Sequence, residues 1–351
     1  MAQYHQGNTI TDDFVLSSSP ASSITISRES YDLYCCLLNS AAQSHRSESV
    51  LTPFPSTFIK NSKKDYDRLR EVLSVMPSCD KVFVEPFCQN GNDITFNYNT
   101  DTDLSQLILD LINHIYRNLV NHGLEKKKIS QEEIRDVFEF ILKKQCNKKF
   151  SVHYVSYQQY LKCNNKPLLL KPDHIFELRY RNNDFDNSST DFYTGFHGSS
   201  IENFYSIVTN SLQNMSGTSH MKTGNAFGNG VYLCEDLRVA RDFSKGAVIS
   251  WENSKLGSHL SAVVQCKVIG KKEYAMKTSS NDENRYLIAQ NSSDLRIQYV
   301  LIFSHFKDEN ELKRSHNFSR GMIYFYIILL IAVIVGNYWK DIKRELKRLS
   351  P

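Results

Sequence analysis

The chain has 351 residues, of which 41% are hydrophobic and 12% aromatic, and its formal net charge is +4. This length and composition can fill one large or two medium globular cores, and they exclude a disordered or fibrous chain. Residues 313–351 hold eight Lys or Arg against two acidic residues, which leaves 34 basic against 36 acidic residues in the rest. The basic character belongs to the C-terminus, so we expect no nucleic-acid surface on the body.

The eight cysteines show no spacing typical of a metal or redox site. No two have the Cys-x-x-Cys separation, and the adjacent Cys35 and Cys36 suit neither a metal nor an ordinary disulfide. We therefore expect buried or free thiols, as in a reducing compartment, and no metal.

The first part of the chain predicts helices. Residues 1–27 are rich in serine and are expected to be disordered, and a helical domain is expected over 28–125. Apolar residues recur at helical spacing in three segments of this domain. They are 29–46, with Leu33, Leu37, Ser40 and Ala41 on one face, then 63–76, and then 103–121 after a polar loop over 91–102.

A second domain is expected over 130–312. Its first element is a fourth helix, which begins at a capping box of Ser130 and Glu133 and reaches about residue 145. The sequence therefore predicts only helices up to this point. Beyond residue 150 the apolar residues alternate, which predicts strands. These are expected at 174–180, 191–196, 231–233, 261–269 and 295–303.

Short helices are expected between the strands. Ser199 and Glu202 have the spacing of a capping box for a helix over 201–208, and Asp236 can cap another over 237–244. The sequence thus predicts an α+β fold, with an all-helical N-terminal domain packed on an antiparallel sheet.

One uncharged stretch, 322–339, predicts a single C-terminal transmembrane helix. As a helix its 18 residues span about 27 Å, near the thickness of an endoplasmic-reticulum bilayer. Aromatic residues lie at both of its ends, as at membrane interfaces. A buried core helix is the alternative, which the lack of any polar face disfavours. Residues 340–351 would form a short basic tail.

Two short runs, "TGFHGSS" at 194–200 and "FGNGVYL" at 227–233, could form two halves of one site. A flat ring could lie between Tyr232 and Phe243, and the main chain of Gly198 could pair with an amide. Gly228 and Gly230 would let the chain wrap around the same ligand. Taken singly, each run also reads as an ordinary turn.

These runs resemble the H-G-S and G-x-G-x-Y motifs of the PARP family of ADP-ribosyltransferases. The following "A-x-x-F" also fits, with Ala240 and Phe243 at the family's small and aromatic positions. "SVLTPFPSTF", "PDHIFELRY" and "DLRIQYVLIFS" resemble the tail-anchored endoplasmic-reticulum member of that family. The similarity covers residues 29 to 339.

The resemblance implies a role for each matching position. His197 would hydrogen-bond the adenosine ribose of NAD⁺. The main chain of Gly198, with a serine hydroxyl, would hold the nicotinamide amide, and Tyr232 and Phe243 would sandwich its ring. The implied catalytic residues are His197, Tyr232 and Tyr286, and the implied cofactor-binding residues are His197, Gly198, Ser199, Tyr232, Ala240, Phe243 and Tyr286.

The third motif position departs from the polymerising members, which carry a glutamate there. The resemblance places Tyr286 at this position, or Arg285 if the alignment slips by one, which would turn the other face of a strand. Glu283 is the nearby carboxylate that could substitute. Without a carboxylate to activate a ribose hydroxyl, only an acceptor that is already reactive is expected to attack. The implied reaction is transfer of one ADP-ribose to proteins, including this chain itself.

Two other functions remain open at this stage. The chain could be an inactive, membrane-anchored module that binds NAD⁺ or ADP-ribose, or a structural membrane protein with a vestigial fold. The intact His197, Tyr232 and Phe243 favour the enzyme. The helical domain could regulate the site or only complete the core, in which Tyr31, Leu33, Leu37, Leu69 and Leu73 must be buried.

The resemblance and the sequence together predict the location. The N-terminus carries no signal-peptide pattern. We expect a tail-anchored protein of the endoplasmic-reticulum membrane or nuclear envelope, with its body in the cytosol near protein acceptors and its tail in the lumen. The resemblance also implies a part in endoplasmic-reticulum stress signalling, the unfolded protein response. Four glycan acceptor patterns, at Asn187, Asn214, Asn291 and Asn317, would instead suit a lumenal body.

Overall fold

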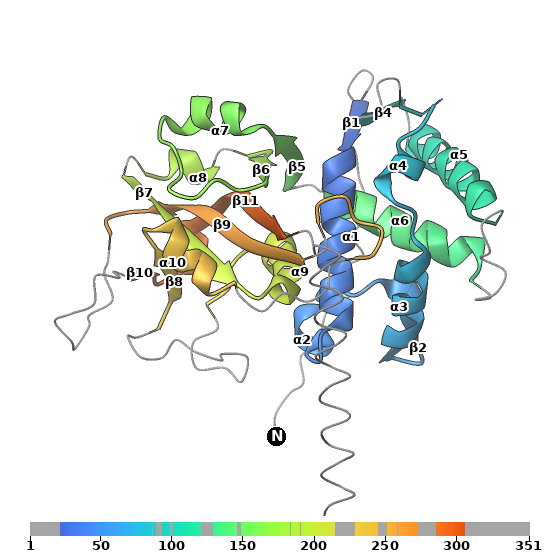
Figure 1. Cartoon of the computed structure of the whole chain (residues 1–351), viewed down its shortest axis with the longest axis horizontal. Coiled ribbons are helices and arrows are strands. Elements are labelled where there is room, and N and C mark those ends of the chain that lie inside the picture. The colour runs from blue at the N-terminus through green and yellow to red at the C-terminus, as the bar shows by residue number, and fades with distance from the viewer. Residues whose placement is uncertain are drawn as a thin grey trace, which may run out of the picture. The chain divides into compact units, whose positions relative to one another are not determined.

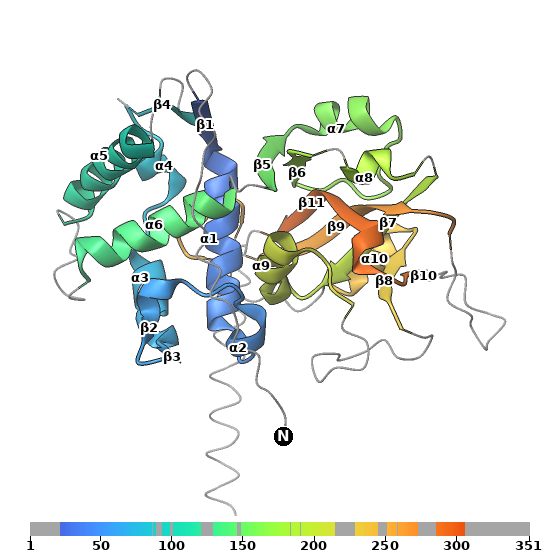
Figure 2. The same ribbon diagram turned by 180° about the vertical axis from the view of Figure 1, so that it is seen from behind.

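A buried helix, α1 (Arg28–Gln43), stands between a layer of further helices and a β-sheet, as Figures 1 and 2 show from opposite sides. The structure is a computed structural model. It describes residues 22–85, 87–88, 93–98, 101–120, 129–145, 149–182, 184–189, 191–214, 229–244, 251–257, 259–272 and 286–305.

The helical layer contains two small β-pairs as well as helices. Beside α1 it comprises α2 (Ser47–Val50), η1 (Ser56–Phe58), α3 (Tyr66–Val75), α4 (Cys79–Val82), α5 (Asp101–Val120) and α6 (Gln131–Gln145). Strand β1 (Ser22–Ser27) pairs with β4 (Asp93–Tyr98), and β2 (Ile59–Lys60) pairs with β3 (Lys63–Lys64). Helix α6 packs on α1, α3 and α5, so it joins the helical layer.

The paired strands β1 and β4 correct three expectations. Disorder over 1–27 is wrong for Ser22–Ser27, the first 145 residues are not all-helical, and 91–102 is not only a loop. The reason is an alternating pattern hidden among polar residues: Ile26 lies opposite Ile94, and both are buried. Residues 1–21 lie outside the described residues.

The predicted antiparallel sheet is confirmed, with seven strands in the order β10-β8-β7-β9-β11-β6-β5. They are β5 (Phe150–Val155), β6 (His174–Tyr180), β7 (Phe192–Ser199), β8 (Val231–Cys234), β9 (His259–Ile269), β10 (Tyr286–Ala289) and β11 (Leu295–His305). The connecting helices are α7 (Tyr157–Asn164), α8 (Asp184–Asn187), α9 (Ile201–Asn210), α10 (Leu237–Asp242) and η3 (Ser292–Asp294). The expected strand at 174–180 matches β6 in both bounds, whereas β7 runs three residues beyond the expected 191–196.

The two faces of the sheet have different cores. One face shares a single hydrophobic core with α1, α9 and the helical layer. The other packs against α7 and α10, through Tyr160, Leu237 and Ala240. The central strands β9 and β11 are therefore covered on both sides, which is why their sequences read as nearly continuous apolar runs.

Helix α1 is buried on all sides rather than on one face. Every residue from Ser30 to Ala42 is buried, because the helical layer covers one side and the sheet with α9 covers the other. Tyr31, Leu33, Leu37, Leu69 and Leu73 all have 0% exposure, which confirms that they had to be buried.

Residues 251–257, the orange segment beside α1 in Figure 1, tie the sheet to the helical layer by hydrogen bonds. Trp251 Nε1 donates to the Leu73 carbonyl at 2.9 Å. The buried Asp32 carboxylate on α1 accepts from Ser254 Oγ and from the Lys255 backbone N–H, both at 2.6 Å. Burial raises the pKa of Asp32, although these hydrogen bonds act in the opposite direction.

The described cysteines are free thiols, as expected: six are buried and Cys163 is exposed. Cys146 and the expected span 322–339 lie outside the described residues. Among the helices that are described, none is long and apolar enough to cross a membrane.

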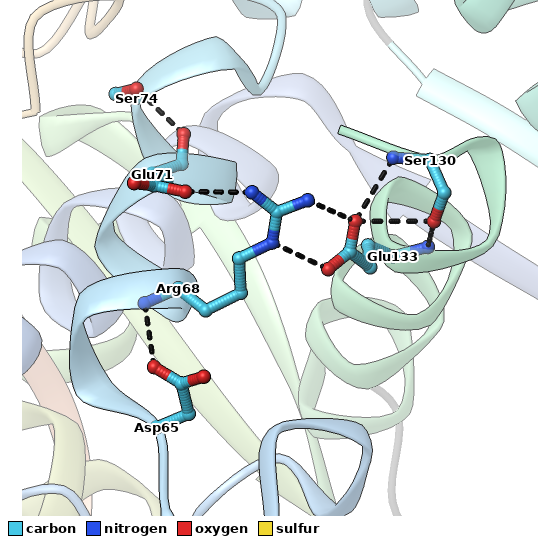
Figure 3. Close-up of polar contacts among 6 residues, drawn as sticks. All are labelled: Asp65, Arg68, Glu71, Ser74, Ser130 and Glu133. Atoms are coloured by element: carbon cyan, nitrogen blue, oxygen red, sulfur yellow. Dashed lines mark hydrogen bonds and ion pairs between the residues drawn. The ribbon is translucent and has the colours of Figure 1, made fainter. Parts of the chain in front are cut away.

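Arg68 on α3 joins the two helices α3 and α6 through the predicted capping box (Figure 3). Its Nε and Nη2 donate to the two oxygens of Glu133 at 2.6 and 2.7 Å. The same carboxylate accepts from the Ser130 backbone N–H at 2.9 Å, and Ser130 Oγ accepts from the Glu133 N–H at 3.2 Å, which confirms the capping box. The hydrogen bonds from Arg68 lower the pKa of Glu133 to about 2.

We expect Glu133→Gln to reduce the free energy of unfolding by roughly 1–2 kcal/mol at pH 7. At that pH the carboxylate is ionised and accepts two hydrogen bonds from Arg68. Because the folded pKa lies below the usual 4.5, this contribution is present above about pH 4.5 and is lost as the pH falls toward 2. Urea unfolding of the full-length chain across this range measures it. Glu71→Gln is the control, since Glu71 also pairs with Arg68 but its side chain is 54% exposed. Equal losses in both variants would contradict the prediction.

Candidate active site

The predicted site residues lie on β7, β8, β10 and α10, with Phe243 as the C-cap residue directly after α10. Strand β7 pairs with β8 only at Phe196 and Cys234, whereas it continues along β9 as far as Ser199. His197, Gly198 and Ser199 are therefore the last residues of a strand. The expectation that His197 follows the strand is wrong, because pairing with β9 extends β7 past residue 196.

His197 is held by a hydrogen bond across the diverging strands. Its Nδ1 lies 2.9 Å from the backbone carbonyl of Tyr232. A carbonyl oxygen only accepts, so Nδ1 carries the proton and donates. Burial lowers the pKa of His197, against the opposing effect of this hydrogen bond. The ring is therefore neutral near pH 7, and Nε2 is left as an acceptor for a hydroxyl donor.

At Gly198, β7 lies directly against the main chain of α10. A Cβ at this position would lie 1.7 Å from the carbonyl oxygen of Ala240 and 2.7 Å from its carbonyl carbon. Only glycine fits against main chain at that distance. The structure thus brings together the predicted positions Gly198 and Ala240, and Ala240 is itself fully buried.

The register of β10 places Tyr286 on the same face as Tyr232. Tyr286 lies opposite Cys234, and Ile288 lies opposite Tyr232, so the four side chains share one face of the sheet. Tyr286 is the first residue of β10. Arg285 and Glu283, the two alternatives, lie outside the described residues.

Phe243 contacts Tyr286 at the end of α10. The ring centroids are 6.1 Å apart and the planes meet at 69°, an edge-on arrangement. Phe243 is 49% exposed, so a large part of its ring is open to a ligand. Burial, and to a lesser extent Cys234, raise the pKa of Tyr286, which stays a neutral phenol near pH 7. The sandwich of Tyr232 and Phe243 remains a prediction.

The capping box expected at Ser199 and Glu202 is wrong. Ser200 is the N-cap of α9, because β7 holds Ser199 in the sheet. Ser199 Oγ instead accepts from Asn203 Nδ2 at 2.7 Å, and the buried Glu202 pairs with Arg46 at 2.6 Å. The cap of Asp236 on α10 is confirmed, since its carboxylate accepts from the Arg238 N–H at 2.8 Å.

Gly230 shows how the second run turns into β8. Its φ is +151°, and a Cβ there would lie 2.4 Å from Ile288 Cγ2. The chain therefore passes directly over β10 before Tyr232. Gly228 lies outside the described residues.

Comparison with known proteins shows which sequences the chain resembles. The chain is 27% identical to the protein mono-ADP-ribosyltransferase PARP16 of Homo sapiens and 26% identical to that of Mus musculus. Each alignment covers 89% of this chain and 94% of the relative. Residues 23–114 match the ARTD15 N-terminal domain. The chain is a distant homologue of PARP16.

The relationship to PARP16 confirms the family resemblance seen in the sequence. The matched N-terminal domain runs from β1 into α5, so it contains most of the helical layer around α1. Within the described residues no group of three or more His, Cys, Asp or Glu could hold a metal ion. Asn203, which donates to Ser199, and Arg46, which donates to Asn203, were not found from the sequence, because no motif or local spacing connects Arg46 with a residue 157 positions away.

We expect Gly198→Ala to lower both stability and affinity for NAD⁺, because β7 and α10 must separate to admit the methyl group. Overpacking of this kind costs about 1–3 kcal/mol. Thermal unfolding and NAD⁺ binding of the full-length chain measure the two effects. Ala240→Gly should not rescue Gly198→Ala, since the clash is with the main chain of Ala240 rather than its methyl group. Full rescue, or unchanged binding in Gly198→Ala, would show that the approach is not this close.

Proposed function

We propose that this chain is a protein mono-ADP-ribosyltransferase that uses NAD⁺ as its co-substrate. The observation that carries the proposal is the His197–Tyr232 hydrogen bond beside the Gly198–Ala240 contact, which unites the two motifs in one place. The homology to PARP16, whose name states this activity, supports it. In the reaction the bond between nicotinamide and the ribose C1′ breaks, and an acceptor oxygen of a protein forms the new bond to C1′.

The side chains fit the parts of NAD⁺ in a consistent way. With Nδ1–H committed to the Tyr232 carbonyl, His197 Nε2 can accept a hydrogen bond from a ribose hydroxyl of the adenosine half. The exposed ring of Phe243 and the ring of Tyr232 offer stacking surface for nicotinamide. The protein's contribution is then to hold NAD⁺ so that the acceptor meets C1′ as positive charge develops there.

Tyr286 bears on the length of the product. Elongation requires a base that activates a ribose hydroxyl of an ADP-ribose already attached. A phenol whose pKa is raised by burial is a poor base near pH 7. Protein carboxylates are ionised without help, so they remain suitable acceptors. A single ADP-ribose per acceptor site follows, with this chain among its own acceptors.

The alternative is a module that binds NAD⁺ or ADP-ribose without cleaving it. The same His197 and Gly198 contacts would serve that role, so binding alone does not distinguish the two. Cleavage does, because only the enzyme releases nicotinamide and leaves ADP-ribose on protein.

The full-length chain incubated with labelled NAD⁺ should incorporate label, and mass spectrometry should find single ADP-ribose units. Ladders of poly-ADP-ribose would show that Glu283 or another acid acts as the missing base. Binding of NAD⁺ with no release of nicotinamide would favour the binding module instead.

His197→Ala and Tyr232→Ala should each reduce incorporation by about a hundredfold or more, since misplaced NAD⁺ loses the geometry for attack. Near-normal labelling by either variant would contradict the assignment of that residue. His153→Ala serves as the control. His153 lies on the edge strand β5, at the opposite end of the sheet from β10, and its side chain is hydrogen-bonded to Ser151.

For the location, we propose the endoplasmic-reticulum membrane or nuclear envelope, with the helix over 322–339 as anchor and the body in the cytosol. The cytosol supplies NAD⁺, and the free thiols suit a reducing compartment. A part in the unfolded protein response is the matching role, since a body on this surface meets proteins of that membrane.

Glycosidase treatment and protease protection of membranes test this topology. Asn187, Asn214 and Asn291 are exposed, so burial would not shield them from glycosylation in the lumen. We expect no mobility shift after glycosidase and full digestion of the body by added protease. A shift, or a protected body, would place it in the lumen and separate it from cytosolic acceptors.

A further inference from the structure

Arg46 reaches from the helical layer into the first turn of α9, directly after the site strand. It lies in the turn between α1 and α2, within the matched N-terminal domain. Its Nη2 donates to Glu202 Oε1 at 2.6 Å and to Asn203 Oδ1 at 2.9 Å. Figures 1 and 2 both show α9 beside α1, and the two helices pack together.

The contact is largely withdrawn from solvent, so it adds little net stability. The side chain of Glu202 is 9% exposed and that of Arg46 is 21% exposed. Arg46 Nε is buried without a hydrogen-bond partner among the described residues. Taking such groups out of water offsets most of their attraction, so a buried ion pair contributes little net stability. What it does supply is one defined position of α9 relative to α1.

The hydrogen bonds from Arg46 determine which way the Asn203 amide faces. An arginine side chain only donates, so Asn203 must present Oδ1 to it. Its Nδ2 then faces Ser199 and donates to Oγ at 2.7 Å. Because Ser199 Oγ accepts this hydrogen bond, its own O–H proton is free to donate to another acceptor. The direction of every bond in the chain Arg46, Asn203, Ser199 is therefore set by the arginine.

We propose that Arg46 is a positioning residue for the NAD⁺ site, acting through Asn203 to hold Ser199 as a hydrogen-bond donor toward an acceptor oxygen of NAD⁺. The helical domain thereby does more than complete the core: it determines that the Ser199 hydroxyl acts as a hydrogen-bond donor in the site. This inference rests on the proposed function, because it requires NAD⁺ to occupy the site at Ser199.

Asn203→Asp tests the direction of the bonds and keeps the contact with Arg46. An ionised aspartate still accepts from Arg46 but cannot donate, so Ser199 must turn its proton toward it. We expect the KM for NAD⁺ to rise about fivefold with kcat within about twofold, the size of one lost hydrogen bond. Asn203→Ala, which removes the contact and leaves the Arg46–Glu202 pair, should raise KM to a similar extent.

A double variant tests whether the effect of Asn203 on NAD⁺ binding passes through Ser199. In Ser199→Ala, addition of Asn203→Asp should change KM no further, since the group on which it acts is gone. Direct binding of carba-NAD⁺, in which the bond between nicotinamide and the sugar is not cleaved, should show the same pattern. Arg68→Met is the matched control: it breaks the ion pair of Figure 3, so it should lower the Tm while the KM for NAD⁺ stays within about twofold.

The outcomes separate this inference from the proposed function. A normal KM in Asn203→Asp, in a wild type that binds and transfers, would overturn the role of Arg46 and leave the function standing. Additive effects of Asn203→Asp and Ser199→Ala would also overturn it, since they would show a route that bypasses Ser199. A wild type that binds no NAD⁺ would overturn both.

Discussion

Burial of α1 on all sides is the constraint on which the rest of this structure depends. A helix with buried residues from Ser30 to Ala42 must be covered by two layers at once, and here the helical layer supplies one and the sheet with α9 the other. The two parts therefore share one hydrophobic core. The carboxylate of Asp32, buried in the same helix, is satisfied by residues 251–257 of the sheet domain. Neither part could separate without exposing both apolar surface and a buried charge.

The site is built largely from main-chain contacts at the edge of this core. His197 is oriented by the carbonyl of Tyr232, and Gly198 lies against the carbonyl of Ala240. Side chains fixed in this way depend on the positions of whole elements, namely β7, β8 and α10. Since β7 is also paired with the buried strand β9, the backbone positions of His197, Gly198 and Ser199 are fixed by the sheet.

Periodicity was enough to predict the α+β fold class and most strands of the sheet, and the two motifs pointed to residues that the structure brings together, His197 with Tyr232 and Gly198 with Ala240. They failed where the signal is not local. Strand β1 was missed because Ile26 finds its partner, Ile94, about seventy positions along the chain. The capping box at Ser199 was predicted from spacing alone, but pairing with β9 keeps Ser199 in the strand. Arg46 meets α9 only through the packing of α1, which no sequence pattern records.

Two of the Arg–Glu pairs, Arg68–Glu133 and Arg46–Glu202, show how position decides what the same chemistry does. Arg68 and Glu133 join two helices near the surface, where the carboxylate also caps α6, so their effect remains within the layer. Arg46 and Glu202 lie at the boundary with the sheet domain, where the second acceptor of the arginine is Asn203, the residue that donates to Ser199. Through Asn203, the ion pair is thereby linked to Ser199. The shared core around α1 holds the arginine in place, so under the role proposed for Arg46 an element that completes the core would also orient one hydrogen-bond donor of the site.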